Sequence, residues 1–200
     1  PLGRPILGPP ENIRRFSRQD IRRFVSREFA PDRIVIAIAG SFDPASIEAQ
    51  LRRLFEPVSP NGHERNPVIA PSPAYRSHNV EKKLAQVHFC MGTDGPARTS
   101  DDRFAFAVMS TILGGGSSSR IFQEVREKRG LAYSIGSMDF AFKDTGCFAV
   151  SGGTGPRNAQ KVVCLCLEEV KKIYREAVTK EELASAREQI RSGMLLGMES

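Results

Sequence analysis

The sequence has 200 residues, of which 40% are hydrophobic and 26% are charged, and its 29 Lys and Arg against 23 Asp and Glu give a formal net charge of +6. This ordinary globular composition excludes a collagen-like chain, a low-complexity chain and a disulfide scaffold. No apolar run reaches the roughly 18 residues of a membrane-spanning helix, so we expect none. The chain begins at Pro1 without a secretory signal, and we expect a fragment of a longer protein whose targeting signals lie outside it.

The first third of the chain is predicted to contain a helix, a strand and a second helix. Residues 1–12 hold four prolines and are expected to be a loop. Ser17 begins the sequence S-R-Q-D, which is typical of a capping box at a helix start. Residues 33–39 (RIVIAIA) have the continuous, β-branched pattern of a buried central strand. Asp43 followed by Pro44 predicts the start of the next helix.

The remainder of the chain follows a proline-rich stretch. Residues 57–78 contain five prolines and no long apolar periodicity, which predicts a linker. Beyond it we expect a strand over residues 84–91 and two helices over 100–113 and 118–128. A hairpin over 132–142 with 147–151 and a helix over 156–177 follow. The sequence T-K-E-E from Thr179 predicts a last helix that begins with a capping box closed by Glu182. Because this order includes a hairpin, it favours a two-layer α+β sandwich over a parallel doubly wound sheet.

The cysteines and histidines form no recognisable metal motif. C-x-x-C, H-E-x-x-H and H-x-x-E-H are all absent, so we expect no zinc site in this chain. We expect free or buried thiols rather than disulfides for the four cysteines, Cys90, Cys147, Cys164 and Cys166.

A basic segment accounts for most of the net charge. Between Arg14 and Arg27 there are six arginines and one acid, Asp20. Phe16 and Phe24 interleave with them, and such a helix could follow the phosphates of a nucleic acid. We prefer an amphipathic helix that has the phenylalanines on its apolar face and the arginines on its solvated face.

Two glycine-rich stretches invite a phosphate-loop interpretation. The run Gly114, Gly115 and Gly116 lacks G-x-x-x-x-G-K-[ST] and follows a helix rather than a strand. The G-G-T-G at residues 152–155 lacks the G-x-G-x-x-G spacing. Both are expected to be turns, although the first could also be a flexible loop that contacts a substrate.

Arg126 and Tyr133 are the candidate binding pair. They flank a predicted helix end in R-E-K-R-G-L-A-Y, so they can point to the same side. A guanidinium and a phenolic hydroxyl can bind a peptide carbonyl or an oxyanion. The alternative is that Tyr133 packs at the strand end and Arg126 pairs with Glu127 or with solvent.

Residues 114–134 resemble the segment L-G-G-G-x-S-S-R-L-F-x-x-x-R-E-x-x-G-L-A-Y of the insulinase (pitrilysin) zinc metallopeptidases, and most closely the mitochondrial processing peptidase branch. Residues 1–8, 32–43 and 179–183 resemble further segments of that family in the same order, so the resemblance covers essentially the whole chain. The family's catalytic H-x-x-E-H precedes the part resembled here. The chain therefore resembles the non-catalytic region, often called the inactive domain.

The resemblance implies a fold and a division of the chain. The fold is α+β, a two-layer sandwich of a mostly antiparallel sheet with helices on one face. Two such halves would form a clam shell around an unfolded peptide, and one half would carry zinc. Residues 1–57 would end the catalytic half, 58–79 would be the proline-rich linker, and 80–200 would begin the second, non-catalytic half.

The resemblance also implies roles and partners. Tyr133 would donate to the scissile carbonyl or to the oxyanion, and Arg126 would hold the substrate backbone. The expected partners are a peptide substrate and the zinc-bearing half, with zinc held only there and with no nucleic acid or membrane. A bacterial cytoplasm or periplasm is favoured, and a mitochondrial location is an alternative.

Other functions and arrangements stay open at this point. The chain could belong to a non-peptidase homologue that acts as a scaffold or partner subunit or, more remotely, could bind nucleic acid through the segment from Arg14 to Arg27. Each half is incomplete, which leaves a sheet edge uncovered. We therefore expect residues 34–39 to complete the sheet of residues 80–200, within one chain or by exchange in a homodimer.

Overall fold

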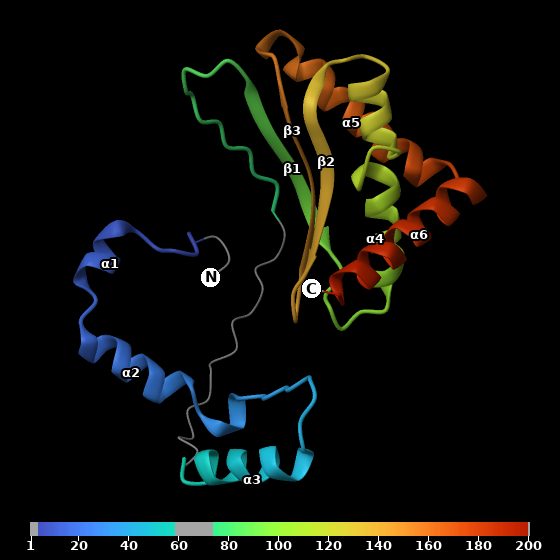
Figure 1. The fold of residues 1–200 in the computed structure, drawn as a ribbon. Helices are drawn as coiled ribbons and strands as arrows, with labels where there is room; N and C mark the ends of the chain where they lie inside the picture. Colours follow the sequence, from blue (N-terminus) through green and yellow to red (C-terminus); the bar gives the residue numbers. More distant parts are fainter. Residues whose placement is uncertain (1–3, 59–73, 200) are drawn as a thin grey trace. The chain divides into compact units, whose positions relative to one another are not determined.

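The computed structural model describes residues 4–58 and 74–199, and these ranges belong to two compact units. Most of the expected linker, residues 58–79, lies outside the described residues. The first unit contains three α-helices and one 3-10 turn, namely α1 (Pro10–Arg15), α2 (Arg18–Glu28), η1 (Pro31–Arg33) and α3 (Pro44–Phe55) (Figure 1).

Both helix starts predicted in this unit are confirmed. The Ser17 hydroxyl accepts a hydrogen bond from the Asp20 amide, and the Asp20 carboxylate accepts one from the Ser17 amide at 3.0 Å, which completes the capping box of α2. The Asp43 carboxylate caps α3 by accepting from the Ser46 amide at 2.9 Å. The prediction of a loop over residues 1–12 is wrong at its end, because α1 begins at Pro10. A proline fits the first helical position, since the N–H that it lacks would have no partner within the helix.

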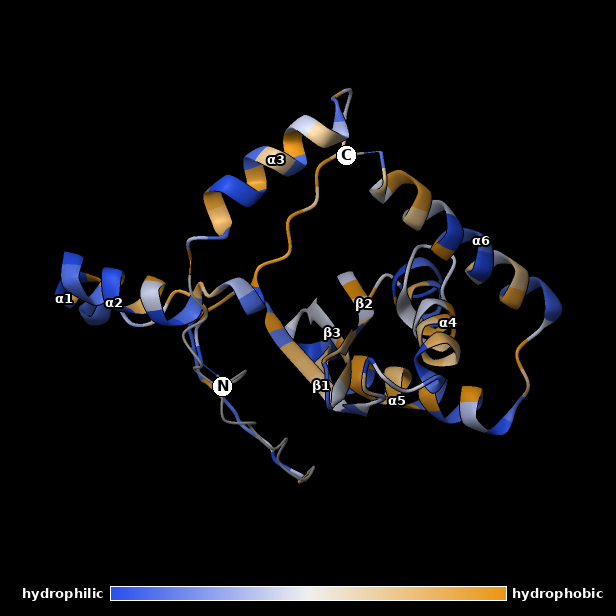
Figure 2. Ribbon diagram, turned by 90° about the horizontal axis from the view of Figure 1, so that it is seen from below, coloured by the Kyte–Doolittle hydropathy of each residue, from blue (hydrophilic) through white to orange (hydrophobic). Residues whose placement is uncertain are grey.

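The strand predicted at residues 33–39 does not form among the described residues. Residues 34–39 run without regular secondary structure, and Val35 is 93% exposed. Figure 2 shows this stretch, between α2 and α3, in the colour of hydrophobic residues. The prediction of a buried strand is wrong here because an extended segment needs a neighbouring strand to pair its amides and carbonyls, and β propensity alone supplies none.

The second unit is built on a three-stranded antiparallel sheet. Its strands are β1 (Val87–Gly95), β2 (Ala132–Ala141) and β3 (Gly146–Thr154), in the order β1-β3-β2. Residues 34–39 are not among the three strands of this sheet within the single chain described, contrary to the first of the two expected arrangements. Exchange of this segment in a homodimer stays a prediction. The β2–β3 hairpin is confirmed, whereas β1 begins three residues later than predicted.

The helices of the second unit gather on one face of this sheet (Figure 1). They are α4 (Asp102–Gly114), the π-helix η2 (Phe122–Glu127), α5 (Ala159–Arg175) and α6 (Lys180–Gly197). The capping box predicted at the start of the last helix is present between Thr179 and Glu182. An antiparallel sheet with helices on one face confirms the predicted α+β sandwich.

A hydrophobic core joins the sheet to the helices. Its fully buried members include Leu113 of α4, Val150 of β3 and Val162 of α5. Removing a side chain of this size from water stabilises a fold by about 1.5–3 kcal/mol. In the first unit, by contrast, the one buried residue among those described is Ala30. The candidate binding pair therefore lies on the unit that has a core.

Candidate functional site

Arg126 and Tyr133 are brought together by the fold. Arg126 Nη1 donates a hydrogen bond to the Tyr133 carbonyl oxygen at 2.7 Å. The guanidinium carbon of Arg126 also lies 4.8 Å from the centre of the Tyr133 ring and 4.7 Å from the centre of the Phe122 ring. Both separations are within the range of cation–π attraction, so one guanidinium contacts two rings and one backbone carbonyl.

Two backbone irregularities produce this arrangement. Tyr133 is the extra residue of a β-bulge, because Ala132 pairs with Thr154 while Ser134 pairs with Gly153. A bulge redirects a side chain and leaves one residue of the ladder unpaired. Arg126 lies in η2, and π-helices occur mostly as single turns, frequently at functional sites. The Tyr133 carbonyl, at this irregular position of the ladder, accepts the hydrogen bond from Arg126.

The turn between η2 and β2 fixes the separation of the pair. Gly130 has a φ of +61°, a left-handed conformation that glycine adopts without strain. Its amide donates to the Arg126 carbonyl at 2.9 Å, and the Leu131 amide donates to the Val125 carbonyl at 2.9 Å. The buried Thr154 hydroxyl donates to the Leu131 carbonyl at 2.5 Å. These bonds hold the end of η2 against the start of β2.

The Tyr133 side chain is available to a ligand. It is 78% exposed, and its hydroxyl has no hydrogen-bond partner in the part of the chain that the structure describes. The alternative interpretation required the Tyr133 side chain to pack at the strand end, and this exposure does not agree with it. The pairing of Arg126 with Glu127 that the alternative interpretation named is present at 3.8 Å, beside the shorter bond to the Tyr133 carbonyl.

Phe122 was missed by the sequence analysis. Its ring packs against the hydrophobic core and lies under the Arg126 guanidinium. The available signal was the four-residue spacing of Phe122 and Arg126, which places two side chains on one helix face. The bulge at Tyr133 has no such signal, because it depends on the pairing of β2 with β3.

The glycine run packs closely against β2 and α6. Gly114 is buried at the end of α4, and a Cβ there would collide with the backbone nitrogen of Ser137 on β2. The Gly115 carbonyl accepts a hydrogen bond from Gln189 Nε2 of α6 at 2.8 Å. Gly116 also lies against the Gln189 side chain. The run therefore lets α4 end close to β2 and α6.

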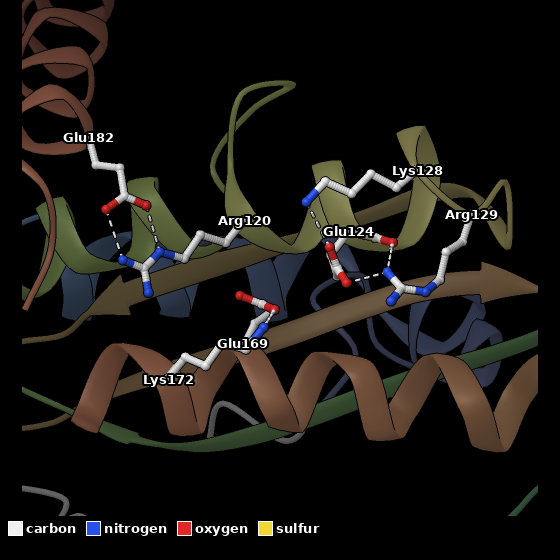
Figure 3. A network of polar contacts seen from close by, with 7 residues as sticks. All are labelled: Arg120, Glu124, Lys128, Arg129, Glu169, Lys172 and Glu182. Carbon is white, nitrogen blue, oxygen red and sulfur yellow. Dashed lines mark hydrogen bonds and ion pairs between the residues drawn. The ribbon is translucent and has the colours of Figure 1, made fainter. Parts of the chain in front are cut away.

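A bidentate ion pair anchors α6 next to this turn (Figure 3). Arg120 donates to both carboxylate oxygens of Glu182, at 2.6 and 2.8 Å. Glu182 also accepts from the Thr179 amide at 2.9 Å, so one carboxylate serves the ion pair and the capping box. The Arg120 hydrogen bonds lower the pKa of Glu182 to about 2, against the opposing effect of partial burial.

The other acidic groups of Figure 3 are paired as well. Glu124 accepts from Lys128 Nζ at 3.0 Å and from Arg129, and these hydrogen bonds lower its pKa. The buried Glu169 accepts from Lys172 Nζ at 2.6 Å. These paired carboxylates stabilise the helices, and none is positioned as a free general acid or base.

No metal site is formed within residues 4–58 and 74–199, where no three His, Cys, Asp or Glu side chains come together. His63 lies outside the described residues. The residues of these two ranges therefore do not fit a zinc ion. All four cysteines are free, as expected, and burial raises the pKa of the Cys166 thiol to about 11, which keeps it protonated.

The arginine-rich segment forms α1 and α2 of the first unit. Arg23 contacts Asp20 at 3.7 Å, and Arg27 and Arg33 contact Glu28 at 2.9 and 3.4 Å. The apolar residues on the other side of α2 are also exposed, among them Ile21, Phe24 and Val25.

No helix in the described ranges is both long and apolar enough to cross a bilayer.

The sequence is similar to those of known proteins over essentially its whole length. The family model of the peptidase M16 inactive domain matches residues 15–190. A Streptomyces coelicolor protein named as an uncharacterized zinc protease is 37% identical over 99% of the chain and 45% of its own length. A Bacillus subtilis protein, also named as an uncharacterized zinc protease, is 30% identical over the whole chain and 48% of its own length. The chain spans about half the length of these curated relatives.

Solved structures share the fold at lower identity. The peptidase M16 inactive domain from Pseudomonas fluorescens has a TM-score of 0.81 at 24% identity, over 92% of this chain and 45% of that one. A Helicobacter pylori protease has a TM-score of 0.78 at 20% identity, over 97% and 48%. A chain of complex III2 from Candida albicans gives 0.73 at 19% identity, over 97% and 48%. At these identities the likeness shows the fold alone.

Proposed function

Because this chain belongs to the peptidase M16 family as its inactive domain, we propose that it is the substrate-binding, non-catalytic part of a zinc metalloendopeptidase that cleaves unfolded peptides. The observation that carries this proposal is the exposed Tyr133 hydroxyl, held on a bulge beside the Arg126 guanidinium. A catalytic metal would be supplied by another part of the parent protein, since the described residues offer no cluster of ligands.

In this proposal Tyr133 and Arg126 bind the peptide backbone. The Tyr133 hydroxyl would donate to the scissile carbonyl oxygen and would stabilise the negative charge that develops on it. Arg126 uses one N–H on the Tyr133 carbonyl, and its remaining donors can bind a second peptide carbonyl. In a zinc-dependent parent, loss of the hydroxyl in Tyr133→Phe would lower kcat by about 10²-fold or less, as expected for one oxyanion donor.

The division of the chain is part of the same proposal. Residues 1–57 would complete a catalytic half that carries zinc, and residues 80–200 would begin the non-catalytic half. The exposed apolar residues of the first unit support this division, because such surfaces need a covering partner. The chain's span of about half the length of its relatives is also consistent with it.

The fold does not by itself imply peptidase activity. A chain of complex III2 from Candida albicans has a similar fold, so a scaffold role is the second candidate. The two candidates differ at Tyr133, because a scaffold does not need an exposed hydroxyl that is held in place for a substrate.

Binding of an unfolded polypeptide tests the proposal. Fluorescein-labelled β-casein would be titrated with the full chain and followed by fluorescence anisotropy. We expect saturable binding that Tyr133→Phe weakens about two- to tenfold, the value of one hydrogen bond. Tyr174→Phe is the matched control, since Tyr174 on α5 is also a highly exposed tyrosine. Equal affinities for the wild type and Tyr133→Phe would contradict the proposal, as would zinc-dependent cleavage of casein by the chain alone.

A further inference from the structure

We infer that Phe122 is a positioning residue that holds the Tyr133 hydroxyl in place through Arg126. This inference rests on the proposed function, in which Tyr133 contacts the peptide. Phe122 packs against the hydrophobic core at one end of this chain of contacts, and Tyr133 is exposed at the other end. The Arg126 guanidinium lies over both rings, 4.7 Å from the first and 4.8 Å from the second.

Tyr133 needs such support because few other contacts hold its side chain in one position. As the extra residue of a bulge, it is left out of the regular pairing with β3. Its ring makes no ring–ring contact within the described residues, and most of its surface faces solvent. A tyrosine that is free to change rotamer would lose side-chain entropy on binding a peptide, so restraint before binding raises affinity.

Arg126 provides that restraint only if it is itself held. Its hydrogen bond to the Tyr133 carbonyl fixes one nitrogen of the guanidinium, but an arginine side chain retains several rotatable bonds. The Phe122 ring provides a further contact beside the 3.8 Å ion pair with Glu127, and unlike that carboxylate it does not compete for the N–H donors. Phe122 therefore orients the guanidinium without using the hydrogen bonds that a peptide would need.

The first arm of the test is spectroscopic and needs no ligand. The Arg126 Nε–Hε resonance of the ¹⁵N-labelled chain would be assigned by its loss in Arg126→Lys. We expect it upfield of solvated arginines because of ring currents, and we expect Phe122→Leu to shift it back toward them. Phe104→Leu is the matched control, because it removes another phenylalanine under an arginine, 4.2 Å from Arg103, and should shift only the Arg103 resonance. A wild-type Arg126 resonance at the solvated position would overturn the inference.

The second arm measures β-casein affinity by the anisotropy titration. We expect Phe122→Leu to weaken binding about two- to fivefold, the value of one exposed cation–π contact, and Phe104→Leu to leave it unchanged. Phe122→Tyr keeps an aromatic face and should restore the wild-type affinity. If Tyr133→Phe weakens binding but Phe122→Leu does not, the positioning role fails and the proposed function stands. If neither variant weakens binding, the proposed function itself fails.

Discussion

The two units of the chain use the same local signals and reach different outcomes. Ser17 with Asp20 and Thr179 with Glu182 form equivalent capping boxes at the starts of α2 and α6. The helices of the first unit nevertheless expose their apolar side chains, whereas those of the second unit enclose a core on one face of a sheet. The comparison shows that local signals determine where a helix begins, whereas the stability of a unit depends on burying the apolar faces of its helices.

The energetic reason is the length of the helices. An isolated helix of 11 or 12 residues, such as α2 or α3, is marginal in water. Caps and surface ion pairs contribute little to such a helix unless its apolar face is covered. We therefore expect substitutions in the second unit to change its cooperative unfolding, and matched substitutions in the first unit to leave that transition nearly unchanged.

The largest difference is expected in hydrogen exchange. The amides of residues 34–39 belong to no strand, so they should exchange near the rate of an unfolded chain. Amides of residues 148–150 lie in the central strand β3 and should exchange about 10³-fold or more slowly, through unfolding of the unit. Mass spectrometry of peptic fragments would measure both. Slow exchange over residues 34–39 would show that this segment has found a strand partner, which gel filtration could identify as a second copy.

The next largest difference is expected in the free energy of unfolding when a large apolar side chain is shortened. Leu113→Ala removes a fully buried side chain and should lower the free energy of unfolding by about 2–5 kcal/mol. Leu54→Ala, at an exposed position of α3, should change it by less than about 0.5 kcal/mol. Urea unfolding followed by circular dichroism at 222 nm would compare them. Similar losses for both variants would mean that the first unit has a core of its own.

A smaller effect is expected from the ion pairs. Glu182→Gln should lower the free energy of unfolding at pH 6 by about 1–2 kcal/mol, because the Arg120–Glu182 side chains are only 15% and 28% exposed. Glu48→Gln breaks a pair with Arg52 in which the side chains are 64% and 65% exposed, and should have no measurable effect.

The pH dependence of this ion pair sharpens the test. The pKa of Glu182 falls from 4.5 in the unfolded chain to about 2 in the folded one. The stabilisation is therefore complete above about pH 4.5 and is lost as the pH falls toward 2. Urea titrations of the wild type and Glu182→Gln should differ less at pH 3 than at pH 6. A difference that does not depend on pH would rule out the ionised carboxylate as its cause.

The smallest effect is expected at the helix caps. Thr179→Ala removes the cap of α6 and should lower the free energy of unfolding by about 1 kcal/mol. Ser17→Ala removes the equivalent cap of α2 and should reduce helix content without moving the cooperative transition. Thermal melts recorded by circular dichroism would separate the two. Equal shifts of the transition would show that both units unfold together.

The sequence by itself determined the features that depend on a few neighbouring residues. The capping boxes at Ser17 and Thr179 and the Asp43–Pro44 helix start were all predicted, since each involves contacts within one helical turn. The hairpin and the α+β class followed from apolar periodicity and turn residues. The segment 114–134 was sufficient to indicate the family, because it carries a closely spaced set of motif residues.

Only the tertiary structure decided the features that depend on a distant partner. Residues 33–39 have every local property of a strand, yet pairing requires a neighbouring strand that local sequence cannot specify. The bulge at Tyr133 depends on the register with β3, and the need for glycine at position 114 depends on the approach of Ser137. The sequence identified Arg126 and Tyr133 as a pair. Their contact with Phe122 is set by the π-helical turn and the bulge, because these determine where the three side chains meet.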